Sequence, residues 1–217
     1  MNRYLSVITN FGCHYTCPYC VVKNNNLHIP KTTVEGLDKL GEMIDKYECN
    51  WVSVSGGGDP LFEVKEHIDW FDAFFKICKE KCVKTELHTS LIITSEIQHM
   101  LYPQYDFDRI VYHCHTVEDL FRIRPRIDQI VRVVFVVTED FTPEKIDTIA
   151  TIAKNSPYID ELSFRQMIDS NYQTTHYCED YLRASHKKDW WYIEQCDYNI
   201  YYAENEVKFK YEDFKEN

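Results

Sequence analysis

Three cysteines near the start of the sequence, Cys13, Cys17 and Cys20, lie within eight residues of one another. Thiolates are soft ligands that favour zinc and iron–sulfur clusters. A structural zinc ion takes four ligands in a closed tetrahedron, and the neighbouring His14 completes such a set only in a strained local geometry. A cubane cluster has four irons, so three cysteines leave one iron without a protein thiolate. We therefore predict a [4Fe-4S] cluster here, with a zinc site and metal-free thiols as the alternatives.

A glycine-rich segment holds half of the six glycines in the sequence, in the run Ser55-Gly56-Gly57-Gly58-Asp59-Pro60. Glycine lets backbone carbonyls and amides approach a ligand closely, and it permits positive φ. An ordinary turn also uses Gly-Asp-Pro, so the segment by itself is compatible with a binding loop and with a plain turn. It follows the second predicted strand, just as the cysteines follow the first. Loops in such positions carry the chemistry of parallel α/β folds.

The cysteine spacing, CxxxCxΦC with Tyr19 at the aromatic position Φ, resembles the signature of the radical S-adenosylmethionine (SAM) superfamily. The resemblance implies that Cys13, Cys17 and Cys20 bind the cluster, whose open iron chelates the amino and carboxylate groups of SAM. It also implies that Tyr19 lies against the adenine. A reduced cluster would cleave SAM to a 5′-deoxyadenosyl radical, which removes a hydrogen atom from a substrate. The implied partner is a one-electron donor such as flavodoxin or ferredoxin.

The glycine-rich segment is similar to the GGE(P) loop of the same superfamily, which holds the SAM amino group. Asp59 stands where glutamate is commoner, and Gly56 is an extra glycine ahead of the motif. Two motifs in the expected order, separated by one predicted helix, support each other. The residues that match the loop, and that we expect to bind SAM, are Gly57, Gly58, Asp59 and Pro60.

Polar side chains also end the third and fourth predicted strands. His88 and Ser90 end the third strand, where radical SAM proteins often bind SAM through polar side chains, so we expect both to contact SAM. Glu86 shares a face with His88 by the two-residue period of a strand. His113 and His115 end the fourth strand and are candidates for acid–base catalysis, although a histidine in this position is more often a packed residue.

Arg132 is a charged residue inside the apolar fifth predicted strand. A buried guanidinium needs an anionic partner, and the SAM carboxylate or an acidic substrate would serve. Arg132 is therefore a candidate for SAM binding and for catalysis. Arg165 and Gln166, in the sixth strand, face the same cavity in one interpretation, and in the other they pair with neighbouring carboxylates.

Short apolar runs alternate with amphipathic stretches, which indicates the α/β class. Helices are expected from about residue 33, and over residues 64–78, 95–101, 117–122 and 143–154, the last with Thr142 as its N-cap. Six strands in βα order imply right-handed crossovers and a parallel sheet, and the superfamily resemblance implies a partial (β/α)6 barrel. The predicted strands cover residues 4–9, 51–55, 83–89, 109–114, 130–137 and 158–167.

The segment after residue 168 is rich in tryptophan and tyrosine, and residues 203–206 are typical of a hairpin turn. We predict a radical SAM core over residues 1–168. Residues 169–217 would form an aromatic-rich extension that packs on it as a cap or β-hairpin. Cys178 and Cys196 lie in the extension without CxxC spacing, so we do not expect a second cluster.

The composition restricts the class of protein and its partners. A net charge of −11 argues against an extended nucleic-acid-binding surface. Apolar runs fall short of the roughly 20 residues that cross a bilayer. The short stretch before Cys13 leaves no room for a signal peptide, and an odd number of cysteines, nine, favours reduced thiols. We therefore expect a cytoplasmic protein.

The substrate stays open between a small molecule and a peptide. A glycyl-radical-enzyme activase and a peptide-modifying maturase both suit a chain of this length. The alternative from another class is a non-enzymatic module that binds zinc or an iron–sulfur cluster for structure or regulation.

Overall fold

The structure is a computed structural model that describes residues 3–92, 105–124, 129–184, 188–193 and 199–215. The helix predicted near residues 95–101 and the tail cysteine Cys196 lie outside these ranges. The described chain forms a nine-stranded sheet with helices, which confirms the predicted α/β class.

All six predicted strands are present, and they lie side by side in chain order with parallel pairing. Each of these strands is almost wholly buried, as expected when both faces of a parallel sheet are covered. Their bounds are β1 (Tyr4–Thr9), β2 (Trp51–Gly56), β3 (Lys84–Thr89), β4 (Arg109–Cys114), β5 (Ile130–Val137) and β6 (Glu161–Gln166).

Three further strands come from the tail and extend the sheet at both sides. Strand β7 (Trp191–Ile193) pairs in parallel with β6, and β8 (Ile200–Ala203) pairs in parallel with β1. Strand β9 (Glu206–Lys208) pairs with β8 in antiparallel fashion, which confirms the predicted hairpin. The two residues of the turn between these strands, Glu204 and Asn205, have φ values of 47° and 66°, as a tight hairpin turn requires. The tail is therefore part of the sheet.

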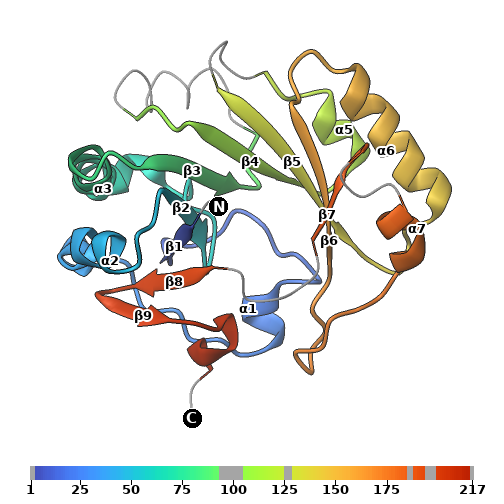
Figure 1. Cartoon of the computed structure of the whole chain (residues 1–217). Helices are drawn as coiled ribbons and strands as arrows, with labels where there is room; N and C mark the ends of the chain where they lie inside the picture. Colours follow the sequence, from blue (N-terminus) through green and yellow to red (C-terminus); the bar gives the residue numbers. More distant parts are fainter. Residues whose placement is uncertain (1–2, 93–104, 125–128, 185–187, 194–198, 216–217) are drawn as a thin grey trace.

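The helices lie mainly on the outer side of a curved sheet, whereas the short α1 (Val21–Asn24) lies on the inner side (Figure 1). The helix expected from residue 33 begins later, because a 3₁₀ turn over Glu35–Leu37 precedes α2 and leaves Val34 exposed. Thr142 caps its helix as predicted and accepts a hydrogen bond from the Lys145 amide. The outer helices are α2 (Leu40–Lys46), α3 (Ile68–Glu80), α5 (Val117–Leu120), α6 (Pro143–Asn155) and α7 (Glu179–Ala184).

Two apolar clusters hold this arrangement together. The larger lies between the sheet and the outer helices, with Phe71 and Phe74 of α3 fully buried in it. The smaller joins β1, the chain after α1 and the tail, and it includes Ile8, Ile29 and Phe214. Burial of apolar surface in each cluster stabilises the fold by about 25 cal/mol per Å² removed from water. Within the described residues, helices fall short of the length and apolarity that a membrane span needs.

Candidate functional site

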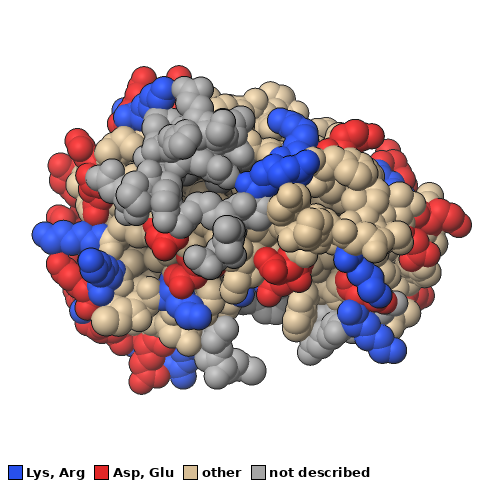
Figure 2. All heavy atoms as spheres, turned by 90° about the horizontal axis from the view of Figure 1, so that it is seen from above, with Lys and Arg blue, Asp and Glu red and all other residues tan. Residues whose placement is uncertain are grey.

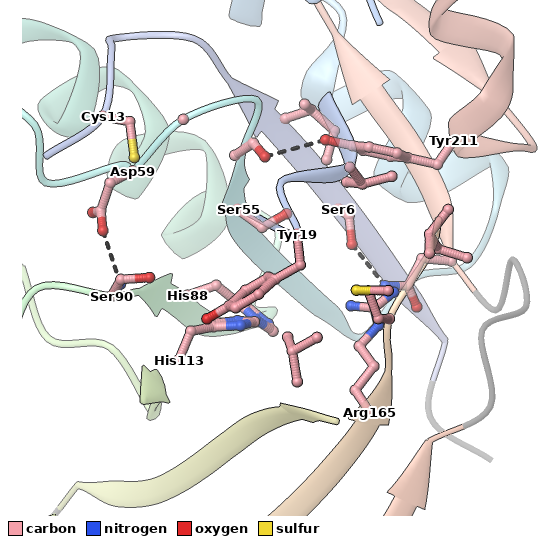
Figure 3. Close-up of a pocket in the computed structure, with 18 of the residues that line it drawn as sticks. Ser6, Cys13, Tyr19, Ser55, Asp59, His88, Ser90, His113, Arg165 and Tyr211 are labelled. Atoms are coloured by element: carbon pink, nitrogen blue, oxygen red, sulfur yellow. Dashed lines mark hydrogen bonds between the residues drawn. The ribbon is translucent and has the colours of Figure 1, made fainter. Parts of the chain in front are cut away.

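A cavity of about 350 Å³ lies where the parallel strands end and the loops after them begin. Cys13 and Tyr19 from the cysteine loop line it, and so do Asp59 and Ser90 (Figure 3). His88 also lines the cavity. The structure thus brings residues from both sequence motifs, and from the end of β3, to one place. This is the edge of a parallel sheet at which ligands bind in α/β folds.

The cysteine loop and the glycine loop are in direct backbone contact. The Asp59 amide donates a hydrogen bond of 2.8 Å to the Gly12 carbonyl, and the Gly57 amide donates one of 2.7 Å to the Thr9 carbonyl. A Cβ atom on Gly58 would lie 1.9 Å from the Gly12 oxygen, and Gly12 itself has a φ of 123°. Glycine is needed here for one loop to pack on the other. The sequence predicted a close approach to a ligand, and the structure shows in addition a close approach between two backbones.

Asp59 is a buried carboxylate, 3% exposed, whose oxygens accept hydrogen bonds from three residues. The donors are the amides of Leu61 and Ser90 and the hydroxyl of Thr89, at 2.8 to 3.0 Å. Such charge-assisted bonds are stronger than neutral ones. Asp59 thus fastens the glycine loop to the end of β3. Of the other predicted loop residues, Gly58 lines the cavity, while Gly57 packs against Ile29.

The three cysteines differ in exposure. Cys13 is exposed and Cys17 and Cys20 are half-buried. Burial raises the pKa of the Cys17 thiol, and negative charge on Cys13 and Cys20 raises it further, so the three sulfurs lie within electrostatic reach of one another. In the described part of the chain, however, groups of three side chains arranged as metal ligands are absent. The donor set, three soft thiols on one short loop, still has the chemistry that iron–sulfur clusters use.

His115 packs between two tyrosines of the cysteine loop. Its ring stacks on Tyr15 at 4.6 Å between centroids, and its Nδ1 lies 2.9 Å from the Tyr19 hydroxyl and 3.9 Å from the Cys17 sulfur. Burial lowers the pKa of His115, so its neutral form is favoured at neutral pH. His115 therefore connects the end of β4 with the cysteine loop. It is not on the cavity lining.

His113, in contrast, lines the cavity and belongs to a chain of three side chains. Its Nε2 lies 3.0 Å from Nδ1 of His88, whose Nε2 lies 2.7 Å from a Glu86 oxygen. Burial lowers the pKa of His113 well below its usual range, and charge on His88 and Arg165 adds to the effect. Burial raises the pKa of Glu86, but His88 and Arg109 outweigh it and bring this pKa down to about 2. These three side chains link the cavity to the buried Glu86 carboxylate.

The anionic partner of Arg132 is a protein carboxylate. Its Nε donates a hydrogen bond of 2.7 Å to Glu161, which lies directly opposite it on β6. Arg109 joins the same group with contacts of 2.7 Å to Glu86 and 3.5 Å to Glu161. Arg132 is not on the cavity lining, so the structure does not support the expected contact with SAM or substrate. Sequence reasoning missed Arg109 because it opens a strand, where an exposed charge is common.

The tail supplies cavity residues that the motifs did not indicate. The Tyr211 hydroxyl donates a hydrogen bond of 3.1 Å to the Gly56 carbonyl, and Tyr201 and Asn199 also line the cavity. Asn199 donates to Ser6 of β1 at 2.8 Å. The aromatic composition of the tail was the available signal, but its position beside β1 depends on long-range pairing. Arg165 and Gln166 line the cavity, as one of the two interpretations expected.

Comparison with known proteins gives a likeness in fold. Family models and curated proteins do not match the sequence. Solved structures of SuiB from Streptococcus suis match the described fold at 15% identity, with TM-scores of 0.57 for SuiB, 0.56 for SuiB bound to S-adenosylmethionine and 0.58 for SuiB bound to the precursor peptide SuiA. Each match covers 90% of this chain and 48% to 50% of SuiB. The chain thus spans about half the length of these structures.

Proposed function

We propose that this chain is a radical SAM enzyme that acts on a peptide. Its core would be a partial (β/α)6 barrel over residues 1–168, and residues 169–217 would complete the cavity wall. The observation that carries the proposal is the backbone contact between the cysteine loop and the glycine loop beside one cavity. The two motifs support each other, because loops that pack together beside one cavity can bind the same ligand.

Cys13, Cys17 and Cys20 would hold a [4Fe-4S] cluster, and Tyr19, Ser90 and His88 would contact SAM. When bound, the cluster supplies the electron that cleaves SAM reductively. Cys17 would have to lose its proton to bind iron. Because burial raises the pKa of this thiol, the proton is still present before binding, so cluster binding would release it and would weaken in acid. His115, neutral and stacked on Tyr15, keeps the loop against β4.

The protein side chains around the cavity would bind and orient the reactants and exclude water. Asp59 keeps the glycine loop fixed to β3, so that the backbone next to SAM is already ordered before SAM binds. Tyr211 holds the Gly56 carbonyl from the tail side. A bound substrate would have to cover the open side of the cavity to keep water away from a reactive intermediate.

A peptide is the substrate class that the comparison favours over a small molecule. One of the similar SuiB structures is bound to the precursor peptide SuiA, and another is bound to S-adenosylmethionine. The electron donor would be a flavodoxin or a ferredoxin.

The deciding experiment is anaerobic reconstitution of the full chain with iron and sulfide, followed by dithionite and SAM. We expect a brown protein with thiolate-to-iron absorbance and the release of 5′-deoxyadenosine. Cys17→Ala should abolish the absorbance and reduce the product at least about 100-fold, because a missing ligand leaves the cluster without its protein site.

Cys82→Ala is the matched control, because Cys82 is exposed and lies at the end of α3, away from the cavity lining. It should keep both signals. A colourless protein that retains zinc, or a cluster that does not react with SAM, would reject the proposal in favour of a non-enzymatic metal-binding module.

A further inference from the structure

Two histidines and a glutamate form a hydrogen-bonded chain that runs from the cavity into the sheet. His88 and His113 come from the neighbouring strands β3 and β4, and both line the cavity. Figure 3 shows their rings side by side, and the ring centroids are 5.3 Å apart. Nε2 of His113 lies 3.0 Å from Nδ1 of His88, and Nε2 of His88 lies 2.7 Å from a Glu86 oxygen. Both are hydrogen-bond distances, so each link needs one donor and one acceptor.

The charge state of Glu86 fixes the tautomers of both rings. Burial raises the pKa of Glu86, but contacts with His88 and Arg109 outweigh it and bring this pKa to about 2. Glu86 is therefore a carboxylate at neutral pH and only accepts hydrogen bonds. His88 has to donate from Nε2, which leaves Nδ1 of its neutral ring as an acceptor. His113 in turn donates from Nε2, so the lone pair of its neutral ring is on Nδ1.

This lone pair of His113 is available to a ligand. Among the residues that the structure describes, none forms a hydrogen bond with Nδ1 of His113. The atom is also not sealed inside the protein, in contrast to Nε2 of His115, which is buried without a partner. Both ring nitrogens of His88 are engaged, so a contact of His88 with SAM would use the ring carbons. His113 thus presents the basic nitrogen of the pair to the cavity.

A proton that binds His113 can be passed on without the loss of a hydrogen bond. When Nδ1 of His113 gains a proton, the Nε2 proton can move to Nδ1 of His88. The positive charge then lies on His88, beside the Glu86 carboxylate. Burial lowers the pKa of His113 well below its usual range, and charge on His88 lowers it further. Arg165 and His115 act in the same direction, and Glu86 opposes them.

The surroundings of Glu86 strengthen its attraction for a charge on His88. On the outer face seen in Figure 2, acidic and basic side chains are interspersed and open to water, which weakens their interactions. Glu86 is only 4% exposed, and Arg109 is only 7% exposed. Water screens charges in such positions much less. The buried end of the chain is therefore suited to hold a proton's charge that arrives from the cavity.

From this chain of contacts we infer that His113 is the general base of the reaction, an inference that rests on the proposed function. The proton comes from an N–H or O–H group of the substrate. The bond to hydrogen breaks, its electron pair stays on the substrate, and the proton binds Nδ1 of His113. The Nε2 proton of His113 passes to His88 in the same step, which needs neither an oxidant nor a reductant. Glu86 and His88 are positioning residues, because they act through His113.

The first measurement follows the ring protons of the ¹⁵N-histidine-labelled, reconstituted full chain by NMR, between about pH 8 and about pH 5. At the alkaline end we expect both rings to carry their proton on Nε2. In acid the pair should take up one proton, with His113 changing from the Nε2–H to the Nδ1–H form while His88 becomes the cation. His176, exposed and 2.6 Å from Glu179, is the matched control and should become a cation by itself. Separate protonation of both cavity rings would overturn the inference.

The second measurement asks whether a neutral donor in the cavity loses its proton. The probe is 4-nitrophenol, whose ionised form absorbs at longer wavelength, and the control is 4-nitroanisole, which has no O–H group. Difference spectra are recorded at a pH at which the free probe is mostly protonated. We expect the bound 4-nitrophenol to be about tenfold more ionised than the free probe, because the cation on His88 is stabilised by Glu86. The spectrum of 4-nitroanisole should not change.

Four variants assign this ionisation to the chain. His113→Gln should bring the ionised fraction to within about twofold of that of the free probe, because the base is missing. Glu86→Gln should do the same, since glutamine can keep the hydrogen bond to His88 but not the charge. Should Glu86→Gln fail to fold, His88→Gln interrupts the same chain at a residue that is partly exposed. The exposed His176→Gln should leave the ionised fraction unchanged.

Two outcomes of the probe measurement would overturn the inference. One is the absence of ionised 4-nitrophenol in the unaltered protein, whether or not the probe binds. The other is ionisation that His113→Gln leaves intact, because another group such as Arg165 would then stabilise the phenolate. Failure of the proposed function is read separately, as absent release of 5′-deoxyadenosine, because neither measurement requires SAM cleavage.

Discussion

The two ends of the parallel strands differ in how their polar groups are used. Toward the N-terminal ends, Glu86, Arg109, Arg132 and Glu161 form a layer in which every charge faces an opposite charge. The Arg109 guanidinium also lies 4.6 Å over the Trp51 ring. Toward the C-terminal ends, loops pack through backbone hydrogen bonds and glycines, and the side chains that remain line a cavity.

This difference shows that the position of a polar residue along its strand decides whether its side chain can reach the cavity. Arg132 and Arg165 both interrupt apolar strands and both face the inner side of the sheet. Arg132 lies opposite Glu161 and pairs with it, whereas Arg165 lies opposite the apolar Val136 and lines the cavity. A charged residue in a strand is thus a ligand candidate only near the strand's C-terminal end.

The largest effect should come from Arg109→Met, which leaves Glu86 buried with one partner fewer. Removing one member of a buried ion pair costs about 3–5 kcal/mol, so we expect the free energy of unfolding in urea to fall by about that amount. Arg132→Met is the matched comparison, because the Arg132 side chain is 22% exposed and pairs with Glu161. It should cost about 1 kcal/mol. Equal losses of unfolding free energy in the two variants would show that the burial of Arg109 does not make its ion pair more important than that of Arg132.

The second effect is a dependence of stability on pH. The pKa of Glu86 is about 2 in the folded protein and near 4.5 when unfolded, so the unfolded chain binds the proton more tightly. The stabilisation is therefore complete above pH 4.5 and is lost as the pH falls toward 2. It amounts to about 3 kcal/mol.

Unfolding free energies measured between pH 6 and pH 2 would check this. Glu86→Gln should flatten the curve in the acid window, because glutamine does not titrate. A variant whose curve keeps the slope of the unaltered protein would assign the acid sensitivity to other carboxylates.

The smallest of the three effects concerns the cavity end of the strands. Asp59→Asn replaces one of two accepting oxygens by an NH2 group that donates, which leaves either the Leu61 amide or the Ser90 amide without its acceptor. We expect a loss of about 2 kcal/mol in the free energy of unfolding. The exposed Asp38→Asn, a matched change, should alter it by less than about 0.5 kcal/mol. A similar loss in both variants would mean that Asp59 does not fasten the loop.

Periodicity located all six core strands and most helices, because buried strands and amphipathic helices leave patterns that depend only on near neighbours. The same applies to the Thr142 cap and the hairpin after Ala203. The cysteine and glycine loops were found because their residue types are unusual at that spacing.

Partners that lie far apart in sequence were not predictable in this way. The bond from Tyr211 to Gly56 and the pairing of Arg132 with Glu161 depend on which strands become neighbours. His115 looked like a catalytic candidate because it follows a strand, yet its neighbours are Tyr15 and Tyr19 from a loop about a hundred residues earlier. Local pattern carries no information on such contacts.

The pairing of β1 with β8 has a consequence for how the protein is made. Leu5 pairs with Ile200, so a ribosome has to translate almost the whole described chain before the cavity wall can close. Contacts of such long range slow folding, and the cysteine loop would wait in the open during synthesis. Under the proposed function, cluster insertion would compete with oxidation of the nascent thiols, and the yield of cluster-bearing protein in cells should depend on oxygen during translation.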